Sequence, residues 1–523
     1  MTKTTLSLAV AMLICGQGAH AGEFEEGSAL LKLGDARGAL TQFQAAASKG
    51  QAAAQHALAQ MYEQGSSVLA QDLVLARRYY RLAAEQGHAP SQYKLAQLIE
   101  SGQGSSQDLA GALRWYRLAA AQGEVSAQSR LGALLSTGVG ALRDEVEASK
   151  WLRQAAEKGD VAAQNGLGEL LDQGRGTPVN SVEAMTWFKK AADQGLAQAQ
   201  FNLGELYAKG RGISAPDHVE GTKWTRKAAD QGLALAQNAL GLAYLNGAGV
   251  SADFVQAREF FRLAAAQNLA DAQYNLGRMV AQGQGGAKDQ ADALKWFRKA
   301  AAQGHVVAQV QLAEMLDLGL GTAKDAGEAT FWIQRAAEKG HAPAQAALGL
   351  RYAQGLGTSA DLGAAIKWNR LAAEQGNADA QYNLGLAFES GVGVPKDRNQ
   401  ALIWFRKAAD QAHAQAQYSL GVMHDQGVVV VQDHAQAVRL YRLSAAQGYV
   451  KAQYALAERY DRGRGVAQSD IKAHMWFNLA AATGDSQAVK FRDYTAKRMN
   501  AEQLASAQKM ATECQAKQLK GCD

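Results

Sequence analysis

The chain has 523 residues, in which 54 Lys and Arg exceed 49 Asp and Glu by five without forming a basic cluster. This balance does not indicate nucleic acid or an anionic membrane as the main partner. With 54 Gly, only five Pro and self-similarity at one short period, the composition indicates a repeat array rather than several globular domains.

The first 21 residues have the features of a secretory signal peptide. Lys3 precedes an apolar run at residues 6–15, and Ala19-His20-Ala21 provides a small-x-small cleavage pattern. Cys15 could suggest a lipoprotein, but the bulky Ile14 before it argues against lipidation. We therefore predict cleavage after Ala21 and export to the periplasm or the medium. No stretch is long enough to span a bilayer, so no transmembrane segment is expected.

A closing glycine recurs thirteen times from Gly50 to Gly484, spaced by 36 residues ten times and by 37 twice, with Asn268 and Ala412 as substitutes. A position that accepts Gly or Asn suits the left-handed end of a helix. The segment that ends at each closing residue is therefore expected to be a helix.

Twelve of these second helices carry an Ala at one fixed position, where the thirteenth has Gly221, and nine units carry a Trp three residues later. The nine are Trp115, Trp151, Trp187, Trp224, Trp296, Trp332, Trp368, Trp404 and Trp476. A tryptophan ladder could bind carbohydrate, but identical helical positions favour a role in the core. Four residues before the Ala lies Asp in most units, replaced by Asn180 and Ser469 in two. Asp, Asn and Ser share the ability to cap a helix, whereas Asn and Ser are poor substitutes for a catalytic carboxylate.

The first helix of each unit carries Gln five residues after the closing position, then Leu, then Gly or Ala. Gly inside a helix costs about 1 kcal/mol relative to Ala, so its use in eight units predicts close approach of the paired helix. The Gln, polar at a half-buried position, is expected to bond to neighbouring backbone. A Gly-x-Gly loop, as in Gly391-Val392-Gly393, joins the two helices; Ser67 and Val429 interrupt it, and these loops are expected to differ in shape.

The unit at residues 379–410 resembles the Sel1-like repeat, a relative of the tetratricopeptide repeat. The resemblance rests on Ala380, Leu384, Gly385, Phe388, Gly391, Gly393, Val394, Asp397, Ala401, Trp404, Ala408 and Ala409. It implies an all-α fold, an α/α solenoid of about 12–13 helix-turn-helix repeats of 36 residues that forms a right-handed superhelix with a concave face for proteins or peptides. We expect residues 22–50 to form an N-terminal capping helix pair, 51–484 the tandem repeats, and 485–523 the C-terminal capping helices and tail.

Cleavage would leave two cysteines, Cys514 and Cys522, eight residues apart. In one continuous helix they would lie about 12 Å apart, too far for a disulfide. Gly521 could end the helix and allow the bond, and two free thiols are the alternative.

The sequence predicts no enzyme, no cofactor and no metal. His88, His305, His341 and His413 each follow a closing position as equivalent turn residues, and no His stands at metal-ligand spacing. No Ser or Cys lies in a nucleophile motif.

A partner surface is expected where first helices of later units carry Tyr and aliphatic side chains away from the inward Leu: Tyr382 with Leu386, Tyr418 with Val422, and Tyr454. The alternative is that these residues pack between adjacent first helices. The function we predict is a monomeric, exported, non-catalytic scaffold that binds a protein or peptide. A periplasmic regulatory adaptor of a signalling or envelope-synthesis protein, or a secreted host-interaction factor, are alternatives; a cell-wall or beta-lactam hydrolase has no site in the sequence.

Overall fold

The computed structural model describes residues 22–519, 521 and 522, and the predicted signal peptide at 1–21 lies outside this range. The described residues form 28 helices. They contain no strand, and their one isolated β-bridge joins Ser66 to Leu69. The expectation of an all-α solenoid of 36-residue helix pairs is confirmed.

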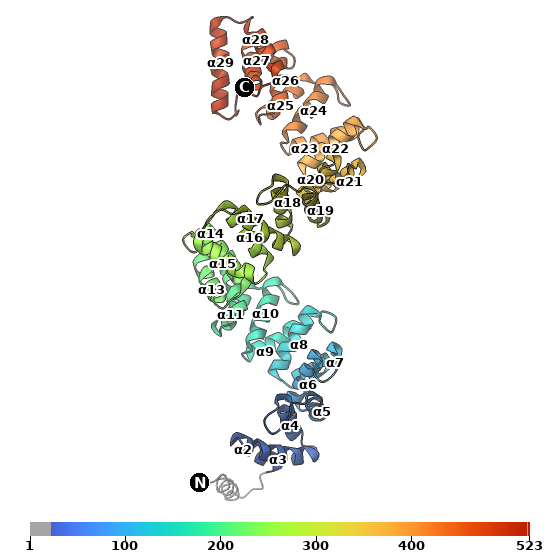
Figure 1. The fold of residues 1–523 in the computed structure, drawn as a ribbon, viewed down its shortest axis with the longest axis vertical. Coiled ribbons are helices and arrows are strands. Elements are labelled where there is room, and N and C mark those ends of the chain that lie inside the picture. Colours follow the sequence, from blue (N-terminus) through green and yellow to red (C-terminus); the bar gives the residue numbers. More distant parts are fainter. Residues whose placement is uncertain (1–21, 520, 523) are drawn as a thin grey trace. The chain divides into compact units, whose positions relative to one another are not determined.

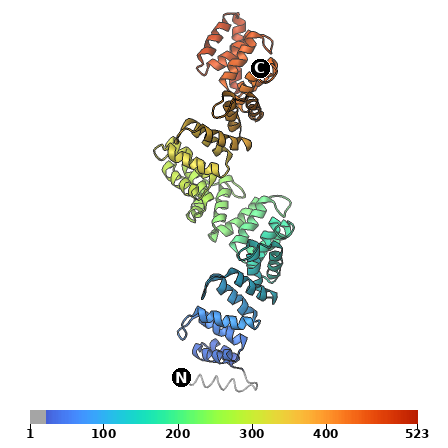
Figure 2. The ribbon, with the colours of Figure 1, turned by 90° about the vertical axis from the view of Figure 1, so that its right-hand side faces the viewer.

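The chain divides into two compact units, Met1–Gln267 and Asn268–Asp523. Within each unit the helix pairs follow one another in chain order, and each helix packs on its sequence neighbours (Figures 1 and 2). In unit 1 the helices are α2(Glu23–Lys32), α3(Ala36–Ser48), α4(Ala52–Gln64), α5(Leu73–Glu85), α6(Ala89–Ser101), α7(Leu109–Ala121), α8(Val125–Thr137), α9(Glu145–Glu157), α10(Val161–Gln173), α11(Ser181–Asp193), α12(Ala197–Lys209), α13(His218–Asp230), α14(Ala234–Asn246) and α15(Phe254–Ala266).

Unit 2 continues the same alternation of first and second helices and ends in two further helices. Its helices are α16(Ala270–Gln282), α17(Gln290–Ala302), α18(Val306–Leu318), α19(Ala326–Glu338), α20(Ala342–Gln354), α21(Leu362–Glu374), α22(Ala378–Ser390), α23(Arg398–Asp410), α24(Ala414–Gln426), α25(His434–Ala445), α26(Val450–Arg462), α27(Asp470–Ala481), α28(Ser486–Ala496) and α29(Ala501–Ala516).

The second helices begin as the sequence predicts. Asp397 accepts hydrogen bonds from the backbone N–H groups of Asn399 and Gln400 at the start of α23. Asn180 and Ser469 accept the equivalent bonds at α11 and α27. The row of acidic residues is therefore a row of helix caps, which satisfy amides that would otherwise lack a partner.

The glycine of each first helix lies against a ring or side chain of its paired second helix, as expected. A β-carbon at Gly385 would lie 2.5 Å from the ring of Phe405, and one at Gly421 would lie 2.7 Å from the ring of Tyr441. These distances are shorter than carbon–carbon contacts allow, so the close packing of the two helices requires glycine there.

The residue after each tryptophan, rather than the tryptophan itself, fills this central position. Trp187, Trp224 and Trp476 are buried, but the other six tryptophans are only half-buried. Trp115, Trp151 and Trp404 nevertheless pack against the core, so the predicted core role is confirmed in part. The indole N–H needs a partner, and half-buried tryptophans find one on their own helix: Trp151 donates to Glu147, and Trp332 donates to Glu328.

The glutamine ladder connects successive units. Gln381 donates through Nε2 to the carbonyl oxygen of Ala373, at the end of the preceding second helix, at 3.1 Å. It accepts through Oε1 from Nε2 of Gln411 at 2.8 Å. The expected hydrogen bond to backbone is confirmed, and the Gln–Gln bond adds a link between neighbouring repeats.

Of the two interrupted loops, one differs in shape and one does not. At Ser67 the loop carries the Ser66–Leu69 bridge, and Gly65 leaves the left-handed helical region. Val429, in contrast, keeps the left-handed conformation of the glycine that it replaces, with φ of 53°. The prediction is therefore wrong for Val429, because the loop keeps its backbone at the expense of strain in a β-branched residue.

The C-terminal helices close the last repeat. Asn500 and Gln503 form a capping box at the start of α29. Cys514, in the last turn of α29, forms a disulfide with Cys522, which lies beyond the helix end at Ala516. Among the described residues, no helix has both the length and the apolar character needed to cross a membrane.

Candidate functional site

A groove of about 440 Å³ lies over three first helices of unit 2, α20, α22 and the start of α24. Its apolar floor comes from α20, where small side chains leave room, and its polar wall comes from α22 and α24. The lining residues are Pro343, Ala346, Ala347, Leu350, Asn377, Asp379, Tyr382, Asn383, His413 and Gln415. A cavity of this size, with an apolar floor and a few polar groups, can accept one or two side chains of a partner.

Tyr382 forms the centre of the wall. Its half-buried ring lies 5.8 Å from the ring of Phe405 and 4.8 Å from the imidazole of His413, measured between ring centroids. Burial raises the pKa of the Tyr382 phenol, so the group stays protonated at neutral pH. The ring is held in place on one side and contributes its remaining surface to the groove.

His413 is the N-cap of α24, which fixes the position of its proton. Its Nδ1 accepts the backbone N–H of Ala416 at 3.2 Å, so the neutral imidazole carries its hydrogen on Nε2. Nε2 lies 3.2 Å from Oδ1 of Asp379. The side chain of Asp379 remains 78% exposed. The groove therefore has one accessible carboxylate at its rim, beside Nε2 of His413.

Two amide side chains in the groove are free to bind. The side-chain amides of Asn383 and Gln415 make no hydrogen bond with any described residue. The side chain of Asn377, in contrast, accepts the backbone N–H of Ala380 as the cap of α22. No lysine or arginine of the described chain lines the groove. The charge of the lining is thus that of Asp379 alone.

The structure separates the residues of the predicted tyrosine surface. Tyr382 lines the groove, and Leu386, 38% exposed, follows one turn later on α22. Tyr418, Val422 and Tyr454 instead pack against the core formed by α25 to α27 and α29. The ring of Tyr418 lies 5.4 Å from that of Tyr449, and the ring of Tyr454 lies 5.4 Å from that of Phe477. Much of their surface is used within the protein.

Sequence reasoning missed most of the groove. His413 was expected to be a turn residue, and its capping bond and its contact with Tyr382 depend on the next repeat. The small residues of α20 look like ordinary helix residues until their neighbours leave a hollow above them. One feature of the sequence could have indicated the groove. In two units an Asp, Asp271 or Asp379, lies two residues before the repeated Gln of the first helix.

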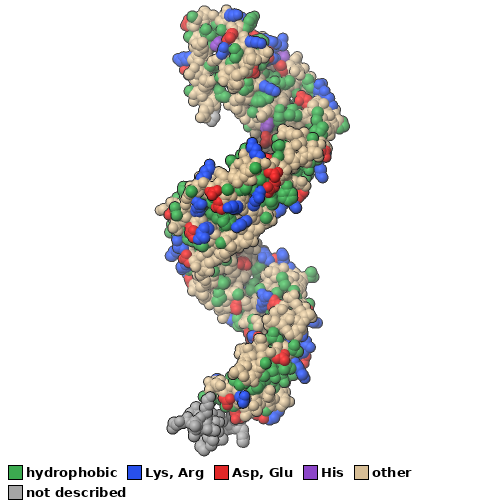
Figure 3. Space-filling model, in the orientation of Figure 1, with side chains coloured by type: hydrophobic (Ala, Val, Ile, Leu, Met, Phe, Trp, Pro, Cys, Tyr) green, Lys and Arg blue, Asp and Glu red, His purple; other side chains and the backbone are tan. Residues whose placement is uncertain are grey.

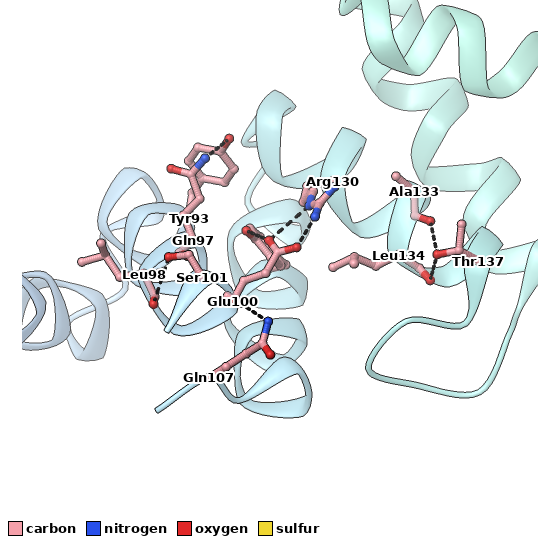
Figure 4. Close-up of polar contacts among 11 residues, drawn as sticks. Tyr93, Gln97, Leu98, Glu100, Ser101, Gln107, Arg130, Ala133, Leu134 and Thr137 are labelled. Carbon is pink, nitrogen blue, oxygen red and sulfur yellow. Dashed lines mark hydrogen bonds and ion pairs between the residues drawn. The ribbon is translucent and has the colours of Figure 1, made fainter. Parts of the chain in front are cut away.

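A second cavity, of about 750 Å³, lies in unit 1 (Figure 4). Its lining comes from α4, α6, α7, α8 and the loops after α6 and α8: Glu63, Gln97, Leu98, Glu100, Ser101, Gln103, Gln107, Leu109, Tyr116, Arg130 and Val139. Figure 4 shows Arg130 reaching across from α8 to Glu100 on α6.

The charges of this second cavity are largely satisfied within the protein. Tyr116 donates to Glu100 at 2.6 Å, and Arg130 Nε donates to the same carboxylate at 3.1 Å. Burial alone would raise the pKa of Glu100, but these two donors outweigh it and lower that pKa. Glu63 is likewise paired with Lys94 and Tyr80. Because these groups already have partners, the unit 2 groove is the stronger candidate for binding.

The described residues offer little for catalysis by a metal. They contain no group of three or more His, Cys, Asp or Glu side chains arranged to hold an ion. On the face drawn in Figure 3, the described basic and acidic side chains are interspersed along both units without a broad patch of one sign.

Stacked pairs of short helices, with a groove over the first helices, define an α/α-solenoid repeat protein. The Sel1 repeat model matches twelve consecutive segments: 52–88, 89–124, 125–160, 161–196, 197–233, 234–269, 270–305, 306–341, 342–377, 378–413, 414–449 and 450–485. The chain belongs to the Sel1 repeat family.

Two solved structures are similar to this chain. A protective antigen present in uropathogenic Escherichia coli strains, displaying an SLR fold, is 35% identical, with a TM-score of 0.64 over 92% of this chain and 96% of that one. A Sel1 repeat protein from Oxalobacter formigenes is 33% identical, with a TM-score of 0.47 over 62% of this chain and 92% of that one. No curated protein matches the chain in sequence.

Proposed function

We propose that the chain is a non-catalytic scaffold that holds a protein partner in the groove over α20, α22 and α24. The observation that carries the proposal is the lining of that groove: an apolar floor and a tyrosine beside one accessible carboxylate and two unpaired amides. Tyrosine together with aliphatic surface is enriched at protein interfaces. The family supports the proposal, since Sel1 repeat proteins typically mediate protein–protein interaction.

We further propose that the scaffold is exported after cleavage behind Ala21. The n-region, the apolar run and the small-x-small pattern of residues 1–21 support this. Fractionation of the source cells, followed by N-terminal sequencing, should recover a chain beginning at Gly22 in the periplasm or the medium. Recovery of the intact N-terminus from the cytoplasm would contradict export.

One observation favours a more specific function, that of a secreted host-interaction factor. The 35% identical neighbour is described as a protective antigen, and the two chains align over most of their lengths. Partition of the protein into the medium would support this version, and retention in the periplasm would favour a regulatory adaptor.

The test of the groove is site-specific photocrosslinking in the native host. Benzoylphenylalanine is placed at Asn383 in the groove or, as a matched control, at the exposed Arg439 on the second helix α25. We expect a discrete crosslinked protein from position 383 and none from position 439. The product should disappear when Leu350→Asp is added in cis. Equal labelling from both positions, or labelling unaffected by Leu350→Asp, would contradict binding in the groove.

A further inference from the structure

Unit 2 contains two copies of one local arrangement, three repeats apart. The octapeptide ADAQYNLG occurs at residues 270–277 on α16 and again at 378–385 on α22, and a histidine caps the following first helix in each case. The two sets are Asp271, Tyr274 and His305, and Asp379, Tyr382 and His413. The second set is the polar wall of the groove.

The contacts within the two sets agree closely. The ring of Tyr274 lies 4.7 Å from that of His305, compared with 4.8 Å between Tyr382 and His413. His305 Nδ1 accepts the backbone N–H of Ala308 at 3.0 Å, and its Nε2 lies 3.3 Å from Asp271. The same three residue types in the same positions thus form the same arrangement of one carboxylate, one phenol ring and one imidazole ring.

The two copies differ in the residue one helical turn after the tyrosine. In the first, the guanidinium carbon of Arg278 lies 5.8 Å from the centroid of the Tyr274 ring. The equivalent residue of the second copy is Leu386, and no described Lys or Arg side chain lies over Tyr382. The Tyr274 ring of the first copy therefore has a cation of the chain beside it. The Tyr382 ring of the second copy has none and lines an open groove.

We propose that the Tyr382 groove takes an arginine or lysine side chain of the protein partner. The cation would lie between the Tyr382 ring and the carboxylate of Asp379, both of which attract positive charge. The aliphatic stem would lie along Pro343 and Leu350 on the groove floor. Asn383 and Gln415 would bond to the partner backbone on either side.

This inference rests on the proposed function and adds the chemistry of the partner. The groove lining holds one carboxylate and no lysine or arginine, so a cationic side chain can form an ion pair with Asp379. Asp379 is largely exposed, so the attraction should weaken as salt rises. An acidic side chain would be repelled by the Asp379 carboxylate, and a neutral side chain would form no ion pair with it.

The experiment uses the full chain and a fluorescein-labelled pentapeptide, Gly-Ala-Arg-Ala-Gly, with an otherwise identical citrulline peptide as the neutral control. Fluorescence anisotropy should show the arginine peptide binding more tightly than the citrulline peptide by a factor of about ten at low salt. Asp379→Asn should remove most of that preference. Tyr382→Phe should keep it, because the ring face and the packing remain.

Exchanging the distinguishing residue between the copies gives the sharpest test. Leu386→Arg should block the peptide by placing a cation of the chain over Tyr382. Arg278→Leu, which leaves the Tyr382 groove unchanged, serves as the matched control and should not alter peptide binding. Equal binding of the arginine and citrulline peptides, or no effect of Leu386→Arg in a protein with unchanged unfolding temperature, would overturn the proposal.

The outcome for the cation can be told apart from the outcome for the scaffold. If the peptide preference fails while the crosslink from position 383 persists, the groove binds a partner of another chemistry. If both fail, the groove is not the binding site.

Discussion

The ring of Phe188 on α11 lies against the backbone of Gly168 on α10, so that a β-carbon at Gly168 would come within 2.7 Å of the ring. We expect Gly168→Ala to destabilise the protein by about 1–3 kcal/mol, because overpacking outweighs the better helix propensity of alanine. Urea unfolding followed by circular dichroism measures the change.

Gly166 on the same helix provides the matched control. A β-carbon there would meet Leu152 at 3.4 Å, an ordinary contact. Gly166→Ala should therefore stabilise the protein by about 0.5–1 kcal/mol. Equal effects of the two substitutions would contradict the role assigned to the Gly168–Phe188 contact.

Replacing Val429 by glycine, the residue found at this position in most repeats, should stabilise the protein. Its φ of 53° lies in the left-handed region, which a β-branched side chain adopts at a cost. Val429→Gly is expected to raise the free energy of unfolding by about 1 kcal/mol. Val431→Gly in the same loop has no such strain to relieve and should be neutral or slightly destabilising; a gain there equal to that at Val429 would refute the explanation.

His56 should make unit 1 sensitive to acid. It shares the hydroxyl of Ser91 with His88, at 2.8 Å and 2.9 Å, and the two imidazole centroids lie 4.9 Å apart. Burial, followed by the charges of His88 and Lys94, lowers the pKa of His56 to about 4, although Glu63 opposes this shift. Burial also lowers the pKa of His88.

The sign follows from proton uptake. Between pH 6.5 and about 4 the unfolded chain binds more protons at His56 than the folded chain, so stability falls as the pH falls through this window. His56→Tyr, which introduces the residue found at the equivalent Tyr93, should reduce the loss. Urea midpoints of both proteins at pH 7 and pH 4.5 measure the difference, and parallel losses would show that His56 is not responsible.

The disulfide between Cys514 and Cys522 should hold the tail on the last repeat. Leu519, at φ of 65°, packs against the core of α25 to α27, and its N–H donates to the carbonyl oxygen of Cys514 at 2.9 Å. Reduction should weaken this segment by about 2 kcal/mol, since the loop is no longer closed covalently. Hydrogen exchange with and without dithiothreitol should show faster exchange at Leu519.

Cys522→Ser serves as the control for this prediction. It should show the fast exchange at Leu519 in either condition, while amides of α26 keep their protection. Slow exchange in the variant would mean that packing alone fixes the tail.

The repeating features of the fold could be predicted because each depends on contacts that every unit makes in the same way. Asp397 caps its own helix, Gly385 meets the second helix of its own unit, and Gln381 reaches the end of the helix just before it. Because the pattern is repeated twelve times, the sequence alone shows that these positions have short-range structural roles. The same basis predicts a core position for Trp404, which packs against the core but stays half-buried.

The groove could not be predicted in the same way. It depends on what a unit lacks, since small residues on α20 leave space that side chains of α22 and α24 border. Tyr382, Tyr418 and Tyr454 occupy one sequence position, yet only Tyr382 lines this groove, because the rings and the tail packed around the other two differ.

The sequence by itself determined the solenoid: the length of the repeat, the helix caps, the glycine contacts and the family follow from periodic residues with short-range roles. The tertiary structure decided which surface is available for binding. Accessibility depends on the side chains contributed by neighbouring repeats. Asp379 and Tyr382 became a candidate site only when α20 and His413 were placed beside them.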